Sequence, residues 1–191
     1  MKITYKNITL RDYQYSDIDD EIRWTNKDVD WFYESSPCSS LERVDPDELR
    51  AEMTEFIENF PDYPIRWKFE IDFEGKHIGT LSSYYLDNNF EYTPWESIDQ
   101  NKNAAENNSI RAIGIEICEK SYWNKGIGAN ALTAFINYYR NIGEKEFLLE
   151  TWSGNKRMLR CAEKLGFEVI KRIENDDSEN NFEDLILKKC Y

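Results

Sequence analysis

Regular alternation of apolar and polar residues marks several strands along the chain. Residues 109–118 carry Ile113, Ile115 and Ile117 at alternate positions, and this spacing predicts a strand with one apolar face. Residues 3–13 alternate less strictly and predict a single edge strand. The runs 65–73 and 77–86 are joined by DFEGK, whose glycine indicates a hairpin loop. Further predicted strands cover 147–152, 167–173 and 182–189, and an acidic turn at 174–181 separates the last two.

Apolar residues recur at helical spacing in four other segments. Ser16 begins a predicted helix that ends near residue 26, because acidic residues follow it as in a capped first turn. Asp45 or Asp47 caps a second helix, which the prolines at 61 and 64 end. The third and fourth predicted helices cover 127–143 and 155–165, and Gly166 is expected to close the last one in a left-handed conformation.

One segment shows neither the alternation of a strand nor the spacing of a helix. Asp87–Asn108 is polar and rich in asparagine, and we interpret it as an inserted loop, because long loops in compact domains are more often functional than structural. The remaining elements follow one another without a repeat or a linker. We therefore expect one domain over residues 1–191.

Composition narrows the class of protein. The 191 residues carry a formal net charge of -13, which disfavours nucleic-acid binding because such binding needs a clustered basic surface. No apolar run is long enough to span a membrane, and the first ten residues lack the layout of a signal peptide. We therefore expect a cytoplasmic protein with no membrane partner. The oligomeric state is left open between a monomer and a homodimer.

Cysteine and histidine counts exclude several kinds of site. The four cysteines are widely spaced and form no C-x-x-C pair, so free thiols are expected rather than a zinc site or a disulfide framework. His77 is the only histidine, which excludes a catalytic triad built on histidine and a metal site with two histidines. We expect no metal.

A glycine turn carries the strongest chemical signal. Gly126 and Gly128 lie between a predicted strand and a predicted helix, so the unpaired N–H groups at the start of the helix face a turn with little side-chain bulk. This favours an anion site over a merely tight turn. A P-loop is excluded because no Gly-Lys-Ser/Thr follows. A Rossmann motif is a distant second, because residues 119–125 separate the glycines from the strand and no repeating βαβ set follows.

Four short motifs together resemble the GNAT superfamily of N-acetyltransferases. They are IEI at 115–117, WNKGIGA at 123–129, ETWSGN at 150–155 and EKLGF at 163–167. Within that superfamily the chain looks most like the ribosomal-protein-alanine acetyltransferases. The resemblance implies a single-domain α/β (α+β) fold with a mixed, mostly antiparallel sheet of about six to seven strands. The sheet would be splayed at the middle, with about four helices on its two faces.

The resemblance also implies the donor and its site. Acetyl-CoA would be the cofactor and CoA the product, lodged where the strands through Glu116 and Glu150 separate. By similarity, the backbones of Ile115 and Ile117 would pair with the pantetheine arm, and the amides at 125–129 would hold the pyrophosphate. The residues implied at this site are Ile115, Ile117, Trp123, Asn124, Lys125, Gly126, Ile127, Gly128, Ala129, Asn155 and Arg157.

Transfer to an amine needs a group that accepts a proton, and a partly buried carboxylate can do this. Glu116 is our first choice for this base; the alternative is an exposed strand residue facing a neighbouring Lys or Arg. Glu150 is a weaker candidate that could pair with an arginine. Asn155 would orient cofactor or water, or cap its helix, or both. Many family members carry a tyrosine that protonates the thiolate at the position of Ala162, so that role is unfilled there.

The acceptor is expected to be a primary amine, either a protein N-terminus or a small cationic amine such as an aminoglycoside or polyamine. Trp31, Tyr33 and Glu150 are the candidate substrate contacts, and acidic residues of the 87–108 insert could attract a cation or simply be solvated. A CoA-binding module without catalysis remains the alternative class, because the usual tyrosine is missing.

Overall fold

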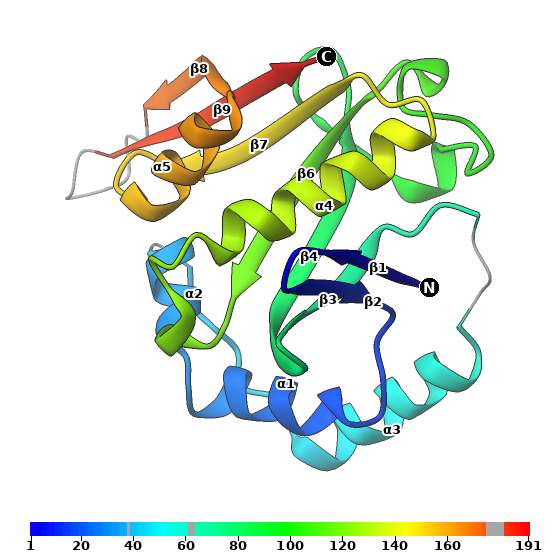
Figure 1. Ribbon diagram of the computed structural model, residues 1–191, viewed down its shortest axis with the longest axis vertical. Coiled ribbons are helices and arrows are strands. Elements are labelled where there is room, and N and C mark those ends of the chain that lie inside the picture. The colour runs from blue at the N-terminus through cyan, green and yellow to red at the C-terminus, as the bar shows by residue number, and fades with distance from the viewer. Residues whose placement is uncertain (38, 61–63, 175–181) are drawn as a thin grey trace.

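The computed structural model describes residues 1–37, 39–60, 64–174 and 182–191. Figure 1 shows an open twisted sheet with α4 crossing its front and α5 lying beside β7–β9. Within the described residues the strands are β1 Lys2–Tyr5, β2 Ile8–Arg11, β3 Lys68–Phe73, β4 Lys76–Leu86, β5 Tyr92–Thr93, β6 Ile110–Ile117, β7 Glu146–Trp152, β8 Glu168–Glu174 and β9 Glu183–Cys190. The helices are α1 Asp17–Asn26, α2 Asp30–Ser35, α3 Pro46–Glu58, α4 Ile127–Asn141 and α5 Lys156–Leu165, with single 3₁₀ turns η1 Trp95–Ser97, η2 Ala105–Asn107 and η3 Lys120–Tyr122.

The sheet divides between β6 and β7. Its strand order is β1-β2-β3-β4-β6-β7-β9-β8, and β5 pairs with the outer end of β4. The β6–β7 pair is parallel, whereas every other described pair is antiparallel. The two strands pair at just two positions, Arg111 with Phe147 and Ala112 with Leu148. Beyond these positions β6 and β7 separate and leave a V-shaped opening, so the mixed, splayed sheet that the resemblance implied is confirmed.

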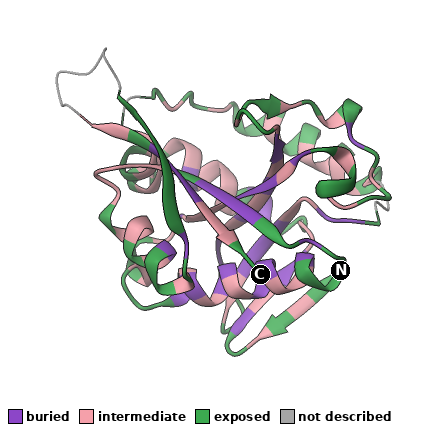
Figure 2. Cartoon of the chain, turned by 90° about the horizontal axis from the view of Figure 1, so that it is seen from above, coloured by how far each residue is buried: buried purple, intermediate pink, exposed green. Residues whose placement is uncertain are grey.

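One face of the sheet packs on α4 and α5 to form the main core. Leu132, Phe135 and Tyr139 of α4 are fully buried against apolar residues of β2, β3, β4 and β7. Figure 2 shows the buried positions concentrated in α4 and the central strands. α1 packs on the other face, where Trp24 contacts the ring of His77 at 4.7 Å between centroids. Removal of α4's apolar stripe from water supplies the main driving force for this arrangement.

The observed strands and helices differ from the predicted ones at several places. The single edge strand predicted at 3–13 is wrong: a turn with Lys6 at a positive φ of 53° splits it into the hairpin β1–β2. This hairpin and the short β5 raise the described strands to nine, against the six to seven expected, and α2 raises the α-helices to five. Asp45 caps α3, and Gly166 ends α5 at φ 81°, as predicted. Pro61, the turn at 175–181 and Cys38 lie outside the described residues.

The 87–108 insert is attached to the core through Glu144, which also forms a buried ion pair with Arg111. Arg111 of β6 is fully buried, and its Nε lies 2.8 Å from Oε1 of Glu144. The same guanidinium donates to Tyr85 Oη at 2.6 Å and packs over the Tyr139 ring. The backbone N–H of Ala104 donates to the Glu144 carboxylate at 3.1 Å. The insert is therefore held in place by an acceptor on the loop that follows α4.

Among the residues that the structure describes, no helix combines the length and the apolar character needed to cross a bilayer.

Candidate active site

A cavity of about 310 Å³ lies at the end of β6, between η3, the start of α4 and α5. Every residue predicted for the donor site lines it except Lys125, which is exposed and lies over the Tyr122 ring instead. The structure adds residues that the sequence did not single out for this site, from α2, η3 and α5. These additional lining residues are Ser35, Tyr122, Met158, Arg160, Cys161 and Lys164, and Trp31 also lines the cavity.

The first turn of α4 presents free backbone donors to this cavity. Gly126 is its N-cap at φ 75°, and no side chain caps the helix, whereas Asp45 caps α3 and Asn155 caps α5. A Cβ built on Gly126 would meet nothing within 4 Å, so the space beside the turn is open. Uncapped N–H groups and the positive end of the helix dipole suit an anion. The residues present therefore fit a phosphate group.

Three cationic side chains line the same cavity from one side of α5. Arg157, Arg160 and Lys164 follow one another at spacings of three and four residues, which places them on one helical face. The Arg157 guanidinium lies 3.6 Å from the centroid of the Trp123 ring, and Trp123 Nε1 donates to the carbonyl of Ile117 at 2.7 Å. The helical spacing of these cations was the sequence signal that could have identified Arg160 and Lys164.

A second cavity of about 190 Å³ adjoins the first. Glu116 of β6 and Glu150 of β7 line it, so carboxylates from the two separating strands reach the same space. The Tyr84 hydroxyl donates to Glu150 at 2.5 Å, and no described arginine pairs with Glu150. Hydroxyl groups of serine and threonine make up much of the remaining wall. The lining residues are Ser35, Ser36, Thr80, Ser82, Ile113, Gly114, Ile115, Glu116, Glu150, Thr151, Asn155 and Met158.

Glu116 lies in a partly buried, acidic environment. Glu70, Thr80 and Glu116 are directly opposite one another across β3, β4 and β6, so their side chains share a face. Burial raises the pKa of Glu116, the charge of Glu70 raises it further, and the charge of Lys68 acts in the opposite direction. A carboxylate with a raised pKa is a better proton acceptor at neutral pH than an exposed one.

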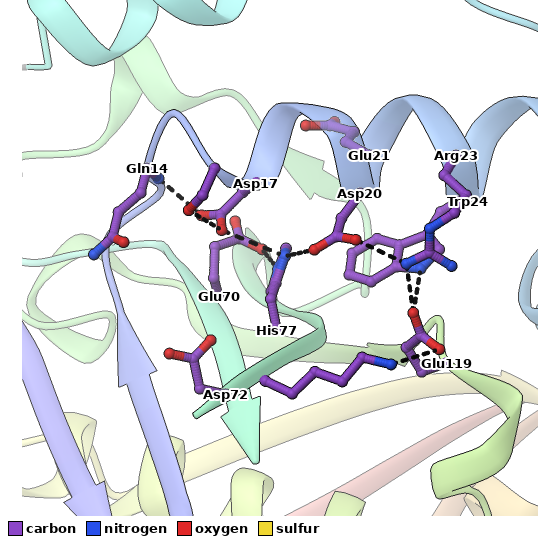
Figure 3. A network of polar contacts seen from close by, with 12 residues as sticks. Gln14, Asp17, Asp20, Glu21, Arg23, Trp24, Glu70, Asp72, His77 and Glu119 are labelled. Atoms are coloured by element: carbon purple, nitrogen blue, oxygen red, sulfur yellow. Dashed lines mark hydrogen bonds and ion pairs between the residues drawn. The ribbon is translucent and has the colours of Figure 1, made fainter. Parts of the chain in front are cut away.

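Behind Glu70 lies the network of polar contacts shown in Figure 3. His77 is 7% exposed; its Nε2 lies 3.1 Å from Glu70 Oε2 and its Nδ1 lies 3.1 Å from Asp20 Oδ2. Burial alone would lower the pKa of His77, but the hydrogen bond to Glu70 and the charges of Glu70 and Asp17 outweigh it and raise the pKa. The network ties α1 to β3 and β4 on the face that carries Glu116.

Three features that the sequence singled out lie away from the two cavities. Tyr33 is 49% exposed and lines neither of them, whereas Trp31 lines the larger one. Ala162 is fully buried in the core between α5 and α4, and the preceding residue, Cys161, lines the larger cavity. No described residue of the 87–108 insert lines either cavity, because the insert follows the far end of β4.

Comparison with protein families identifies the class. A family model described as "Acetyltransferase (GNAT) domain" matches residues 7–168. The chain belongs to the GNAT family of acetyltransferases, and the sequence-based resemblance is confirmed. No curated protein sequence matches the chain significantly.

Solved structures of similar fold include two ribosomal L7/L12 N-acetyltransferases. A RimL alpha-N-protein acetyltransferase in complex with coenzyme A has a TM-score of 0.69 and 15% identity, covering 100% of this chain and 98% of that one. The Salmonella typhimurium enzyme described as modifying the N-terminal serine of L7/L12 has a TM-score of 0.66 and 16% identity, covering 100% and 99%. The microcin C7 self-immunity acetyltransferase MccE, with acetyl-CoA and AMP, has a TM-score of 0.65 and 18% identity, covering 97% and 93%. At these identities the likeness concerns the fold.

Proposed function

We propose that this protein transfers an acetyl group from acetyl-CoA to a primary amine by direct attack. The observation that carries the proposal is the junction of the two cavities. The larger cavity, with uncapped helix amides that suit an anion, is the donor cavity, and the smaller cavity, lined by carboxylates and hydroxyls, is the acceptor cavity. Acetyl-CoA is a substrate here and supplies the activated acetyl group. The proposal includes a single catalytic domain over residues 1–191 and a cytoplasmic location.

Different groups of the chain bind different parts of acetyl-CoA. The amides of residues 126–129 hold the pyrophosphate, and the cationic face of α5 attracts the adenosine-side phosphate. The backbones of Ile115 and Ile117, on the unpaired edge of β6, bind the pantetheine amides. In a chain of net charge -13, these local donors bind an anion against the field of the whole protein.

Glu116 acts as the base. An amine that enters the smaller cavity as an ammonium ion must lose one proton before it can attack a thioester, and Glu116 lines that cavity with a raised pKa. Glu150, held by the Tyr84 hydroxyl, attracts the ammonium ion and orients it. Asn155 accepts at Oδ1 from Met158 N, which caps α5, and Asn155 lines both cavities.

Two acceptor classes fit a small polar cavity with two carboxylates. A protein N-terminus beginning with a small polar residue is suggested by the L7/L12 enzymes of similar fold, one of which modifies an N-terminal serine. A small polycationic amine is favoured by Glu116 and Glu150 in the same wall. The two classes differ in what lies beyond the amine, a neutral peptide or a further positive charge.

A transfer assay that measures free thiol release tests the proposal. Purified protein is incubated with acetyl-CoA and, separately, a heptapeptide beginning with serine, spermidine, or kanamycin. We expect turnover with one class well above acetyl-CoA hydrolysis, and loss of that turnover in Glu116→Gln with CoA binding retained. CoA binding without acetylation of any of these amines would instead support a non-catalytic binding module.

A further inference from the structure

Few residues line both cavities. Ser35, Ile115, Asn155 and Met158 do so, and they mark the junction at which the thioester of the donor meets the amine of the acceptor. This inference rests on the proposed function, because it concerns the same transfer. At this junction one group must supply a proton to the departing thiolate.

The chemistry of these residues leaves one candidate. Ile115 and Met158 carry no exchangeable proton on their side chains, and Asn155 Oδ1 accepts from Met158 N at 3.1 Å. An amide N–H can donate a hydrogen bond but does not give up its proton. Ser35 is half-buried, and its hydroxyl makes no hydrogen bond to any other described residue. A hydroxyl can donate one proton while it accepts another.

The chain holds Ser35 at the junction through its neighbour Glu34. Trp152 Nε1 of β7 donates to the Glu34 carbonyl at 3.2 Å, and the Arg157 guanidinium of α5 lies 3.5 Å from the Glu34 carboxylate. At the other end of α2, Trp31 Nε1 donates to the carbonyl of Trp24 at 3.0 Å. Contacts from β7, α5 and α1 therefore fix the position of α2 and of Ser35 at its end.

Gly154 keeps Trp152 in this orientation. A Cβ built on Gly154 would lie 1.7 Å from a carbon of the Trp152 ring, so any larger residue would displace the indole from its contact with Glu34. The only side chain that allows the ring to lie there is hydrogen. The Trp152–Glu34 contact thus depends on a residue of the loop between β7 and α5.

We propose that Ser35 is the proton shuttle of the transfer reaction. Glu116 takes the first proton, when the ammonium ion becomes the attacking amine. The C–N bond then forms, and the nitrogen carries a surplus proton. Ser35 Oγ accepts that proton and donates its own to the sulfur as the C–S bond breaks. The products are the amide and the thiol, with one proton left on Glu116 for release to solvent.

Other protic groups near the junction do not meet the same conditions. Tyr84 already donates its hydroxyl hydrogen to Glu150. Ala162, at the position where many family members carry a tyrosine, has no donor and is buried in the core. Burial raises the pKa of Cys161 to about 11, and Cys161 lines only the donor cavity of the two. Among the described residues that line both cavities, Ser35 is the one that carries a hydroxyl group.

The first test follows the thiol of bound CoA by its thiolate absorbance as pH is varied. A hydroxyl that donates to the thiolate stabilises the charged form and lowers the pKa of the thiol. We expect that pKa to rise by about one unit in Ser35→Ala, the effect of one hydrogen bond to a charged group. Ser36→Ala is the matched control, because Ser36 lines only the acceptor cavity of the two, and it should leave the thiol pKa at the wild-type value. An unchanged thiol pKa in Ser35→Ala overturns the proposal.

The second test uses whichever of the three amines the wild-type protein acetylates. Ser35→Ala should lower kcat about 100-fold, the usual contribution of one proton-transfer group, with the KM for acetyl-CoA unchanged. Ser35→Thr restores a hydroxyl and should recover most of the rate, and the exposed Ser39→Ala should match wild type. Wild-type kcat in Ser35→Ala rejects the shuttle while leaving the acetyltransferase intact. Failure of the wild-type protein to acetylate any of the amines rejects the proposed function, and the shuttle with it.

Discussion

Gly128 offers a substitution whose effects on folding and on donor binding have opposite signs. It is the second residue of α4, and a Cβ built there would lie 3.7 Å from Ile115 Cδ1, an ordinary contact. Alanine is favoured over glycine in helices by up to about 1 kcal/mol. For a chain of this length, that gain corresponds to a rise in Tm of about 2–4 °C. Gly128→Ala is therefore expected to fold and to be slightly more stable.

The same methyl group lines the donor cavity. Its contact partner Ile115 lies in the cavity wall, so the added carbon occupies space beside the amides that we assign to the pyrophosphate. Loss of one hydrogen bond to a charged group costs about 1.5–3 kcal/mol, which corresponds to binding weaker by about 10- to 100-fold. No general loss of folding could produce weaker binding together with a higher Tm.

Calorimetric titration with CoA and thermal unfolding of the unliganded protein measure the two effects. Asn137→Ala is the matched control, because Asn137 lies further along α4, away from the donor cavity, and its replacement also favours the helix. The control should raise Tm and leave the Kd for CoA unchanged. If Gly128→Ala binds CoA within twofold of wild type, the assignment of the pyrophosphate to this helix end is wrong.

Three further predictions concern charged groups. Glu116→Gln should lower kcat/KM about 100-fold near neutral pH. The wild-type rate should increase with pH through the raised pKa of Glu116, and the variant should lose this increase. The pKa of His77 is raised on folding, so its stabilisation is complete below its unfolded pKa of about 6.5 and is lost as pH rises through the folded value. The difference in unfolding free energy between wild type and His77→Gln should therefore shrink with rising pH. Glu144→Ala leaves Arg111 buried without its partner, which should cost about 3–5 kcal/mol and lower Tm on the order of 10 °C.

Each of these three predictions is checked by its own measurement and is contradicted by its own result. For Glu116, an unchanged pH–rate profile in the variant would remove it from the mechanism. For His77, chemical denaturation at several pH values is needed, and a stability difference that grows with pH would contradict the expected loss of stabilisation. For Glu144, limited proteolysis should cut within 87–108 sooner than in wild type, since Ala104 loses its acceptor; equal resistance would show that the Glu144 carboxylate does not hold the insert.

The parts of the fold that were predicted well from the sequence are those that depend on the local spacing of apolar residues. β6, α4 and the Gly166 cap each depend on residues within one segment, and their boundaries agree with prediction to within a few residues. The anion site expected at the start of α4 also rests on local sequence, because its amides belong to one strand–turn–helix unit. The uncapped start of α4 was indicated by the glycines alone.

Features that depend on distant parts of the chain were not predictable in this way. Ser35 reaches the junction because Trp152 and Arg157, more than a hundred residues later, hold the end of α2. His77 shares a face with Glu70 because the β3–β4 register shifts between Ile71 and Asp72, and a shift of one residue reverses the side a side chain occupies. No alternation pattern in a single strand contains that information.

The short β6–β7 ladder also affects how the protein unfolds. Two paired positions join the β1–β4 and β6 part of the sheet to the β7–β9 part, so the backbone groups of Ile113–Ile117 lack a partner strand on that side. A ligand whose amides bond to both exposed edges would act as the missing strand and join the two parts into one cooperative unit. Amide hydrogen exchange in β7 and β9 should then slow when CoA binds, at positions that never touch the ligand. In this protein the substrate would complete the sheet as well as enter the reaction.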